Sequence, residues 1–549
     1  MKTKKVIQTS LFLLAIAFGI TSFIGFTQCK TAQTNQTPKK PNILFCIADD
    51  ATWKHLSAYG SKWVQTPAFD RVAAEGLLFN NAYTPNAKCG PSRSIILTGR
   101  NSWQLEEAAN HLSFFPTKFK SYPEELSENG YHVGYSGKGW APGTSLNPDG
   151  TKRELLVKAY NKIKKETPTK GINPVDYVSN FKVFLKEKKS NAPFCFWYGG
   201  HEPHRAYEYG TGVSIGKKKL SQIDAVFSYW PPSEIVKNDM LDYALELEYF
   251  DEQLGGLLKV LEENGALENT IVVVTSDNGM PFPRVKGQSY EHGNHMPLAI
   301  MWKNGIKNPG RIIEDYVSFT DFAPTFMEVA GIDAKKQKMQ PIQGKSLVPY
   351  FNSNKAKILA EKDNYVLLGQ ERHDVGRPND VGYPIRGIVK DGFMYLKNYE
   401  NDRWPAGNPE TGYTNSDASP TKTEILNLNR SGENHEYWAM NFGKHPKEEL
   451  YQISIDEDCI NNLADNEQFQ KIKKELEKLM ESELKKQSDP RMFGNGSVFD
   501  KYPAHKNTNF YERYMNGEEV DFRWINETDF EKKDFKQKKE KSAKPPTSI

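Results

Sequence analysis

The feature that most constrains the fold of this 549-residue chain is a recurring pattern of short apolar runs that end in polar residues. These runs occupy residues 41–50, 131–140, 193–204 and 269–279, and a stretch with helical periodicity, residues 242–267, precedes the last of them. Strands that alternate with helices in this way form a mainly parallel sheet covered by helices on both faces. The sequence therefore predicts an α/β fold, and the polar residues stand at the strand ends, where such sheets bind their ligands.

The alternation of helices and strands fades after residue 351, which divides the chain into parts. We predict a large α/β domain at residues 41–351 and a smaller α+β subdomain at residues 352–500. Residues 501–549 form a C-terminal extension. Its basic, proline-containing end, residues 531–549, is predicted to be disordered.

The N-terminus predicts export. Three lysines lie among the first five residues and precede an apolar run at residues 11–20, a pattern typical of a secretory signal peptide over residues 1–28. The run is too short for a transmembrane helix. Residues 29–40 read as a solvated linker that begins with Cys29, which is either a lipid-modified anchor or part of a soluble N-terminus. The expected location is the periplasm or the cell surface.

Charge and cysteine content exclude several classes of protein. The chain has 72 basic and 69 acidic residues, a net charge of +3, so nucleic-acid binding is not expected. Its five cysteines lack the spacing of a disulfide framework or a zinc site. Cys46 and Cys195 lie in apolar runs and are predicted to be inert buried thiols. Cys89 is different, because a reactive free thiol in an exported protein invites oxidation and needs a reason.

Two oxygen-rich pairs of residues follow two of the predicted strands. Asp49 and Asp50 end one strand, and Asp277 and Asn278 end another. Either pair alone could cap a helix or a turn. Together, three carboxylates and an amide oxygen suit Ca²⁺ or Mg²⁺ better than zinc. Without a cation the three carboxylates would repel one another and be driven to protonate.

The segment "CGPSRSIILTGR", residues 89–100, resembles the signature of the type I, formylglycine-dependent sulfatases, C-x-P-S-R followed by T-G-R. By average residue usage, a chance C-x-P-S-R in a chain of this length is on the order of one in a thousand. The stretches "PNILFCIADD", "GYSGKG", "PHR", "VTSDNG" and "DFAPTFMEVAGI" stand beside it in the order of the family. The resemblance covers roughly residues 41–350.

Within the family, "HEPHRAY" and "DNGMPFPRVKGQSY" resemble the heparan N-sulfatase branch, which also includes bacterial enzymes acting on sulfated algal polysaccharides. The resemblance implies an alkaline-phosphatase-like fold. This fold has a large mixed, mainly parallel sheet flanked by helices, with a smaller C-terminal α+β subdomain. Residues 41–351 would then be the sulfatase catalytic domain.

The family resemblance also explains why this protein has a free cysteine at position 89. It implies that a formylglycine-generating maturation enzyme oxidises Cys89 to formylglycine (3-oxoalanine), an aldehyde that hydrates to a geminal diol. One hydroxyl would attack sulfur and the other would later lose its proton and expel sulfate. A plain thiol could attack but could not eliminate. The resemblance further implies one Ca²⁺ per chain. Its ligands would be Asp49, Asp50, Cys89, Asp277 and Asn278.

Four more residues match catalytic positions of the family. Arg93, always charged and planar, would hold the diol and neutralise developing negative charge. Lys138 and Lys286 would bind sulfate oxygens, although on spacing alone both could be ordinary surface lysines. His204 would donate a proton to the departing sugar oxygen, a role that suits the pKa of imidazole. His201 is a weaker substrate-binding candidate, with a core or supporting histidine as the alternative.

One position departs from the family pattern. Family members commonly have G-K-x-H, whereas this chain has Gly137-Lys138-Gly139-Trp140. Trp140 could stack on a sugar ring as a substrate-binding residue, or it could be a core aromatic. Either way, leaving-group protonation depends more heavily on His204.

A charged loop at residues 370–387 is the predicted source of substrate specificity. Arg372, His373, Arg377 and Arg386 could pair with uronate carboxylates or further sulfates, and the alternative is a solvated loop. The expected substrate is a sulfated acidic oligosaccharide or polysaccharide, with ulvan or a glycosaminoglycan as leading candidates and N-sulfates as possible targets beside sulfate esters.

Two rival functions remain at this stage. The first is a phosphoester hydrolase of the same superfamily, which would usually have Ser or Thr in place of Cys89 and a two-metal site richer in histidine. The second is a catalytically silent glycan-binding protein, which only the missing histidine at Trp140 suggests.

Overall fold

The computed structural model describes residues 39–333 and 335–531. The predicted signal peptide, nearly all of the predicted linker with Cys29, and residues 532–549 of the predicted basic tail lie outside these residues. In the two described ranges, no helix has the length and hydropathy needed to cross a membrane.

The central sheet has eight strands, and four neighbouring parallel strands form the half that carries the polar strand ends. Their order across the sheet is β7 (Thr270–Ser276), β1 (Asn42–Ala48), β6 (Phe194–Gly199) and β4 (His132–Gly137). All three pairings between them are parallel. These strands are the four apolar runs of the sequence, so the predicted α/β fold is confirmed.

The other half of the sheet makes it mixed. Strand β9 (Leu298–Met301) runs antiparallel between β7 and β2 (Leu77–Tyr83), and β2 pairs in parallel with β10 (Arg311–Ser318) at the edge. The two-residue strand β8 (His295–Met296) also pairs with β2.

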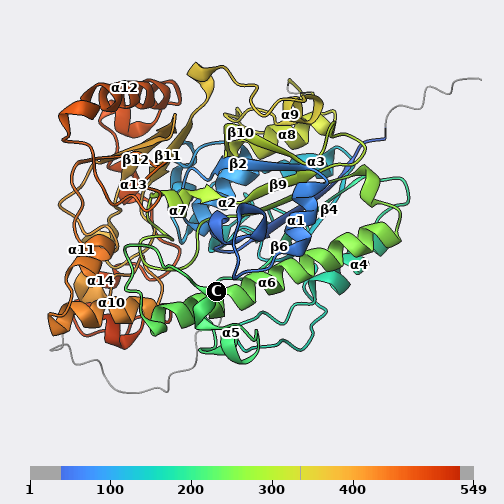
Figure 1. Cartoon of the computed structure of the whole chain (residues 1–549). Helices are drawn as coiled ribbons and strands as arrows, with labels where there is room; N and C mark the ends of the chain where they lie inside the picture. Colours follow the sequence, from blue (N-terminus) through green and yellow to red (C-terminus); the bar gives the residue numbers. More distant parts are fainter. Residues whose placement is uncertain (1–38, 334, 532–549) are drawn as a thin grey trace, which may run out of the picture. The chain divides into compact units, whose positions relative to one another are not determined.

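Helices cover both faces of the sheet, as the buried strands require. On one face lie α1 (Pro67–Ala74), α4 (Tyr177–Glu187) and α6 (Glu234–Glu263). The opposite face is covered by α2, α3 and α8, which Figure 1 shows on the other side of the strands; their bounds are Cys89–Thr98, Tyr122–Glu128 and Phe322–Val329.

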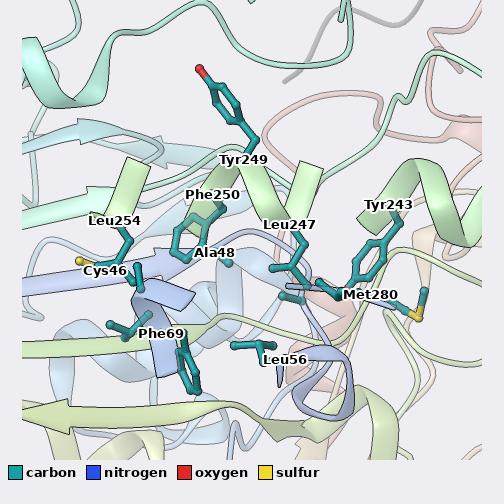
Figure 2. Close-up of a cluster of buried hydrophobic side chains, with 14 of the residues drawn as sticks. Cys46, Ala48, Leu56, Phe69, Tyr243, Leu247, Tyr249, Phe250, Leu254 and Met280 are labelled. Carbon is teal, nitrogen blue, oxygen red and sulfur yellow. The ribbon is translucent and has the colours of Figure 1, made fainter. Parts of the chain in front are cut away.

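The alternation of side chains along β1 divides the core into two layers. Leu44, Cys46 and Ala48 belong to the cluster beneath α6, whereas the residues between them point into the cluster beneath α8. Figure 2 shows Phe250 and Leu254 of α6 pointing toward Cys46 and Ala48. Full burial of a large apolar side chain such as that of Phe250 or Leu254 stabilises the fold by about 1.5–3 kcal/mol.

Helix α6 is longer than its periodicity predicted. It begins eight residues earlier, at Glu234, because the Ser233 side chain accepts a hydrogen bond from the Val236 amide and caps the first turn. It ends at Glu263, just before Gly265, whose φ of 61° is left-handed.

A second, antiparallel sheet follows in the sequence. Its strands are β11 (Val366–Gln370), β12 (Ile385–Lys390), β13 (Phe393–Asn398) and β14 (Glu448–Tyr451), in that order. Helix α12 (Gln470–Lys486) packs against it through Leu476, Met480 and Leu484, an i, i+4, i+8 stripe. The predicted α+β character of this region is confirmed.

This region does not have a wholly separate core. Helices α10 (Pro420–Ser431) and α11 (Glu436–Phe442) place Ile425, Leu426 and Phe442 in the same apolar cluster as α6. The remaining short elements are β3 (Ser113–Phe115), β5 (Gly143–Ser145), α5 (Thr211–Ser214), α7 (Glu291–Asn294), α9 (Val348–Asn352), α13 (Val498–Lys501) and α14 (Phe510–Met515).

The described part of the C-terminal extension, residues 501–531, is folded against the protein. Phe510, Tyr514, Ile525 and Phe530 form a small apolar cluster with Val375. The sequence predicted only that this segment lies beyond the α+β subdomain, and gave no expectation that it packs.

We predict that Asp251→Ala lowers the free energy of unfolding by about 1–3 kcal/mol. The buried Asp251 carboxylate on α6 accepts hydrogen bonds of 2.8 Å from the amides of Ala68 and Phe69, which no side chain within α1 satisfies. Guanidinium unfolding followed by circular dichroism measures the loss. The matched control is Glu252→Ala, which removes the exposed neighbouring carboxylate and should change stability by less than about 0.5 kcal/mol. Equal effects in both variants would contradict the prediction.

Candidate active site

The pairing of β1 with β7 joins the two oxygen-rich pairs. Ala48 lies opposite Ser276 in parallel register, so the residues that follow both strands meet at one edge of the sheet. The Asp50 amide donates to Asp277 Oδ1 at 3.1 Å, and Asn278 Nδ2 donates to Asp50 Oδ1 at 2.7 Å. The predicted cluster of Asp49, Asp50, Asp277 and Asn278 is therefore present and fully buried.

The next two strands add residues on the other side of β1. After β6 the chain turns so that the Asp49 amide donates to Glu202 O at 3.1 Å, which brings His201 and His204 beside the cluster. After β4, the Lys138 amide donates to Gly199 O at 2.7 Å. The Lys138 ammonium then reaches Asp49 Oδ2 at 2.6 Å.

Cys89 is the first residue of α2 and lies over the carboxylates. Its thiol is 3.4 Å from Asp49 Oδ1 and 3.6 Å from Asp50 Oδ1. Burial, together with the negative charges of Asp277 and Asp49, raises the pKa of Cys89 well above its ordinary value. As a thiol, Cys89 therefore stays protonated and is a poor nucleophile at neutral pH.

Arg93 lies one helical turn after Cys89 and so projects from the same face of α2. Its Nε donates to Asp277 Oδ2 at 2.7 Å, Nη2 lies 3.3 Å from Asp49 Oδ1, and Nη1 donates to the carbonyl oxygens of Lys138 and Gly139. The guanidinium is fully buried beneath the thiol. Its predicted contact with a diol stays a prediction, while the structure shows it holding the carboxylates.

Lys286 links the cluster to His204. Its ammonium donates to Asp50 Oδ2 at 2.7 Å, to Asp417 Oδ2 at 2.8 Å, and to His204 Nε2 at 3.0 Å. His204 Nδ1 faces the carbonyl oxygen of Arg205, an acceptor, so Nδ1 carries the proton of the neutral ring. Burial and the charge of Lys286 lower the pKa of His204, and Asp50 only partly offsets this.

The buried cluster fits a divalent cation. Oxygens of Asp49, Asp50 and Asp277 and the Cys89 sulfur all lie within 4.8 Å of one another. Asn278 Oδ1 is buried without a hydrogen-bond partner, as expected for an atom that awaits a ligand. Burial and the charge of Asp49, against the opposing charge of Arg93, raise the pKa of Asp277 to about 7. A hard cation would accept all of these oxygens and remove the repulsion.

Four of the predicted catalytic residues line one pocket: Cys89, Lys138, His204 and Lys286. The same pocket is also lined by residues that the sequence analysis did not select. They are Lys88, His111, Leu112, Pro142, Asp374, Asp417, Lys506 and Trp524.

Some of these additional residues carried a sequence signal. Lys88 directly precedes Cys89, so its position in the motif could have marked it. Asp374 lies in the charged segment at residues 370–387, but only the basic residues of this segment were predicted to bind the substrate. The Asp374 carboxylate pairs with Lys88 Nζ at 2.8 Å and with His111 Nδ1 at 3.2 Å. Asp417, Lys506 and Trp524 had no signal, because only folding brings these distant segments to Cys89.

The predicted substrate-binding role of the basic residues at 370–387 is wrong. Arg372, His373, Arg377 and Arg386 are all buried and none lines the pocket, so the alternative of a solvated loop is also wrong. Arg377 donates to the carbonyl oxygens of Trp404 and Pro405, and His373 lies between Gly287 O and Asn86 Oδ1.

The two other arginines of this loop also have structural partners. Arg372 donates to Tyr502 O at 2.7 Å, and Arg386 forms ion pairs with Glu371 and Asp489. Arg386 lies in strand β12, so part of the predicted loop is a strand. The basic side chains of residues 370–387 thus donate to buried carbonyl and carboxylate oxygens.

The contacts of Trp140 do not agree with a substrate-binding role. This residue packs against its neighbours and does not line the pocket. Its Nε1 donates to Gly90 O at 3.1 Å and to Ser94 Oγ at 2.7 Å, and its ring meets Phe115 edge to face at 5.3 Å. The core alternative therefore holds, and the indole supports α2 behind Cys89.

His201 also lies outside the pocket lining. Burial lowers its pKa to about 3, so the ring is neutral beside the carboxylate cluster. This placement agrees with the alternative of a supporting histidine and not with direct substrate contact.

Comparison with known proteins identifies the class. The family model described as sulfatase matches residues 41–332, more than half of the chain, so the chain belongs to the sulfatase family and is an enzyme of sulfate-ester hydrolysis. A second model, for the C-terminal part of N-sulphoglucosamine sulphohydrolase, matches residues 285–389.

Among individual relatives, an ulvan-active sulfatase of Formosa agariphila is 27% identical over 461 residues, which cover 82% of this chain and 81% of the relative. The human N-sulphoglucosamine sulphohydrolase is 26% identical over 462 residues, covering 78% of this chain and 87% of that protein. A solved structure described as a complex with D-glucosamine-2-N,6-O-disulfate shares the fold, with a TM-score of 0.57 at 22% identity, covering 82% of this chain and 99% of that one.

We predict that the protein binds one Ca²⁺ per chain and that Asp277→Ala abolishes this binding. Removal of one carboxylate leaves too few charged oxygens for a hard cation. Calorimetry measures the binding, and thermal unfolding gives a second readout, because a ligand at about 100 times its Kd stabilises the folded state by about 2.7 kcal/mol.

The matched control for this experiment is Asp149→Ala, which removes an exposed carboxylate and should leave Ca²⁺ binding unchanged. A stoichiometric zinc ion in the purified protein, or unchanged Ca²⁺ binding by Asp277→Ala, would refute the assignment.

Proposed function

We propose that this sulfatase removes sulfate groups from a sulfated acidic polysaccharide, with ulvan and glycosaminoglycans as the leading candidates. The observation that carries the proposal is the buried pocket in which Cys89 begins α2 over three carboxylates while Lys138, Lys286 and His204 face the same space. The relatives named as ulvan-active sulfatase and N-sulphoglucosamine sulphohydrolase support this substrate class.

The proposed nucleophile is not the thiol. Cys89 is protonated in this environment, and a sulfated cysteine could not release its sulfate. An aldehyde hydrate formed at residue 89 by a maturation enzyme would supply one hydroxyl for attack and a second whose deprotonation expels sulfate. Cys89 lies at the first position of a ten-residue helix, where the helix dipole favours negative charge.

The lysines of the pocket are proposed to bind the sulfate group. Lys138 and Lys286 are both at least 96% buried, and each ammonium is held by an aspartate, so both are oriented before substrate arrives. Calcium in the carboxylate cluster would lower the pKa of a hydroxyl at residue 89. Arg93 fixes Asp277 and Asp49 in position for that cation.

His204 is proposed to protonate the leaving oxygen. In this structure its Nε2 accepts from Lys286, and the nearby positive charge keeps the ring neutral. Binding of an anionic sulfate ester against Lys286 would favour the protonated ring, because a nearby negative charge raises the pKa of histidine. The proton would then be available at Nε2, on the side of the pocket.

Export completes the proposal. The lysines and apolar run at the N-terminus support secretion to the periplasm or the cell surface, with Cys29 as a candidate lipid anchor. A polysaccharide substrate agrees with such a location.

We predict that Cys89 is converted when the protein is co-expressed with a formylglycine-generating enzyme. Mass spectrometry of the peptide that contains residue 89 should show the aldehyde or its hydrate, and Cys89→Ala should be inactive. The buried Cys46 is the internal control and should stay a thiol. An active preparation in which Cys89 remains a thiol would overturn the mechanism.

We predict that His204→Ala lowers kcat on a sugar sulfate by about 10²–10⁴-fold, the usual contribution of general acid catalysis. An aryl sulfate should lose much less, because a phenolate leaves without protonation. Steady-state kinetics on both substrates test this. Equal losses would show that His204 binds or positions the substrate and that another group supplies the proton.

A further inference from the structure

The C-terminal extension forms part of the active-site wall. Lys506 and Trp524 line the same pocket as Cys89, His204 and Lys286. Both lie beyond the segments matched by the two family models, residues 41–332 and 285–389. This part of the pocket is therefore contributed by a segment for which the family match gives no role.

The extension is fixed on both sides of these two residues. The amide of His505 donates to Leu112 O at 2.8 Å, next to the pocket, and Trp524 O accepts from the Ala418 amide at 2.8 Å. Farther along, the buried Asp529 carboxylate lies 3.4 Å from Lys422 Nζ and accepts from Thr423 Oγ1 at 2.9 Å. The positions of Lys506 and Trp524 are thus set by the fold before any ligand binds.

Lys506 is the pocket lysine that forms no ion pair within 4.0 Å among the described residues. Lys88 pairs with Asp374, Lys138 with Asp49, and Lys286 with Asp50 and Asp417. These three ammoniums are buried against carboxylates. The charge of Lys506 also helps to lower the pKa of Asp521, but that carboxylate is paired with Arg523, and Lys506 itself is partly exposed and in no ion pair. Its charge is available for an anion that enters the pocket.

Trp524 offers an apolar surface beside this charge. Its Nε1 donates to Thr414 O at 3.0 Å, so the polar edge of the indole is satisfied by the protein. The ring is tilted against Phe510 at 6.0 Å and remains partly exposed. Such a fixed, partly exposed ring suits the C–H face of a sugar.

We propose that Lys506 and Trp524 form a sugar subsite for a substrate that carries a second anionic group, a uronate carboxylate or another sulfate, beside the sulfate being removed. The inference rests on the proposed function. Trp524 packs against the sugar ring and Lys506 pairs with its second anion, which selects acidic saccharides over neutral ones.

The test compares Lys506→Gln, Lys506→Arg and Trp524→Leu on four substrates: an aryl sulfate, a sulfated neutral sugar, a sulfated disaccharide with a uronate, and a disulfated sugar. Loss of one charged hydrogen bond corresponds to roughly 10–150-fold. Lys506→Gln should raise KM by about that factor on the substrates with a second anion, with kcat unchanged, and Lys506→Arg should restore most of the loss. A loss confined to the uronate or to the disulfated sugar identifies the anion.

Trp524→Leu should raise KM on every sugar and leave the aryl sulfate unchanged. The matched control is Lys501→Gln, which removes an exposed lysine of the same extension that does not line the pocket. It should change nothing. If Trp524→Leu lowers the thermal midpoint, Lys506→Gln and Lys506→Arg alone decide the question.

Equal effects of Lys506→Gln on neutral and acidic sugars, or no effect at all, would overturn the subsite while hydrolysis by the wild type upholds the proposed function. If the wild type cleaves none of the sulfates, the proposed function fails. Calorimetric binding of the uronate disaccharide to Cys89→Ala, with and without Lys506→Gln, then tests the subsite without turnover. Equal affinities in that comparison would also overturn it.

Discussion

The parallel pairing of β1 with β7 is the constraint on which the site depends. Because Ala48 lies opposite Ser276, two pairs of residues separated by more than 200 positions in the chain emerge side by side at one edge of the sheet. A slip of one residue in this pairing would turn the polar side chains to the other face. The apolar layers on both sides of β1 prevent such a slip, so the packing of the core also determines the geometry of the site.

Concentrating three carboxylates in a dry interior is costly unless positive charge accompanies them. Arg93, Lys138 and Lys286 supply that charge, and each is buried against a specific oxygen of the cluster. Burial and the charges of Asp277 and Asp49, which Lys138 offsets only in part, raise the pKa of Cys89 and hold its thiol protonated. These electrostatics argue against a thiolate nucleophile and support the proposed cation and the proposed conversion of Cys89.

The second sheet and the C-terminal extension complete the pocket. They contribute Asp374, Asp417, Lys506 and Trp524, which line the same pocket as Lys138 and Lys286. The sequence predicted that specificity comes from this region, but from the basic residues at 370–387. Those side chains turned inward, because buried carbonyl and carboxylate oxygens of the neighbouring segments needed donors. Charge in a loop does not reveal whether solvent, ligand or protein will satisfy it.

The α/β class, the four parallel strands, the polar strand ends and the family signature at Cys89 could all be predicted from the sequence. These follow from local periodicity and from short motifs, whose residues are adjacent in the chain. The packing of Trp140 against α2, the burial of the arginines at residues 370–387, and the positions of Lys506 and Trp524 in the pocket could not be predicted in this way. Such outcomes depend on contacts between residues far apart in the sequence, where burial and hydrogen bonding, and not local pattern, determine the position of each side chain.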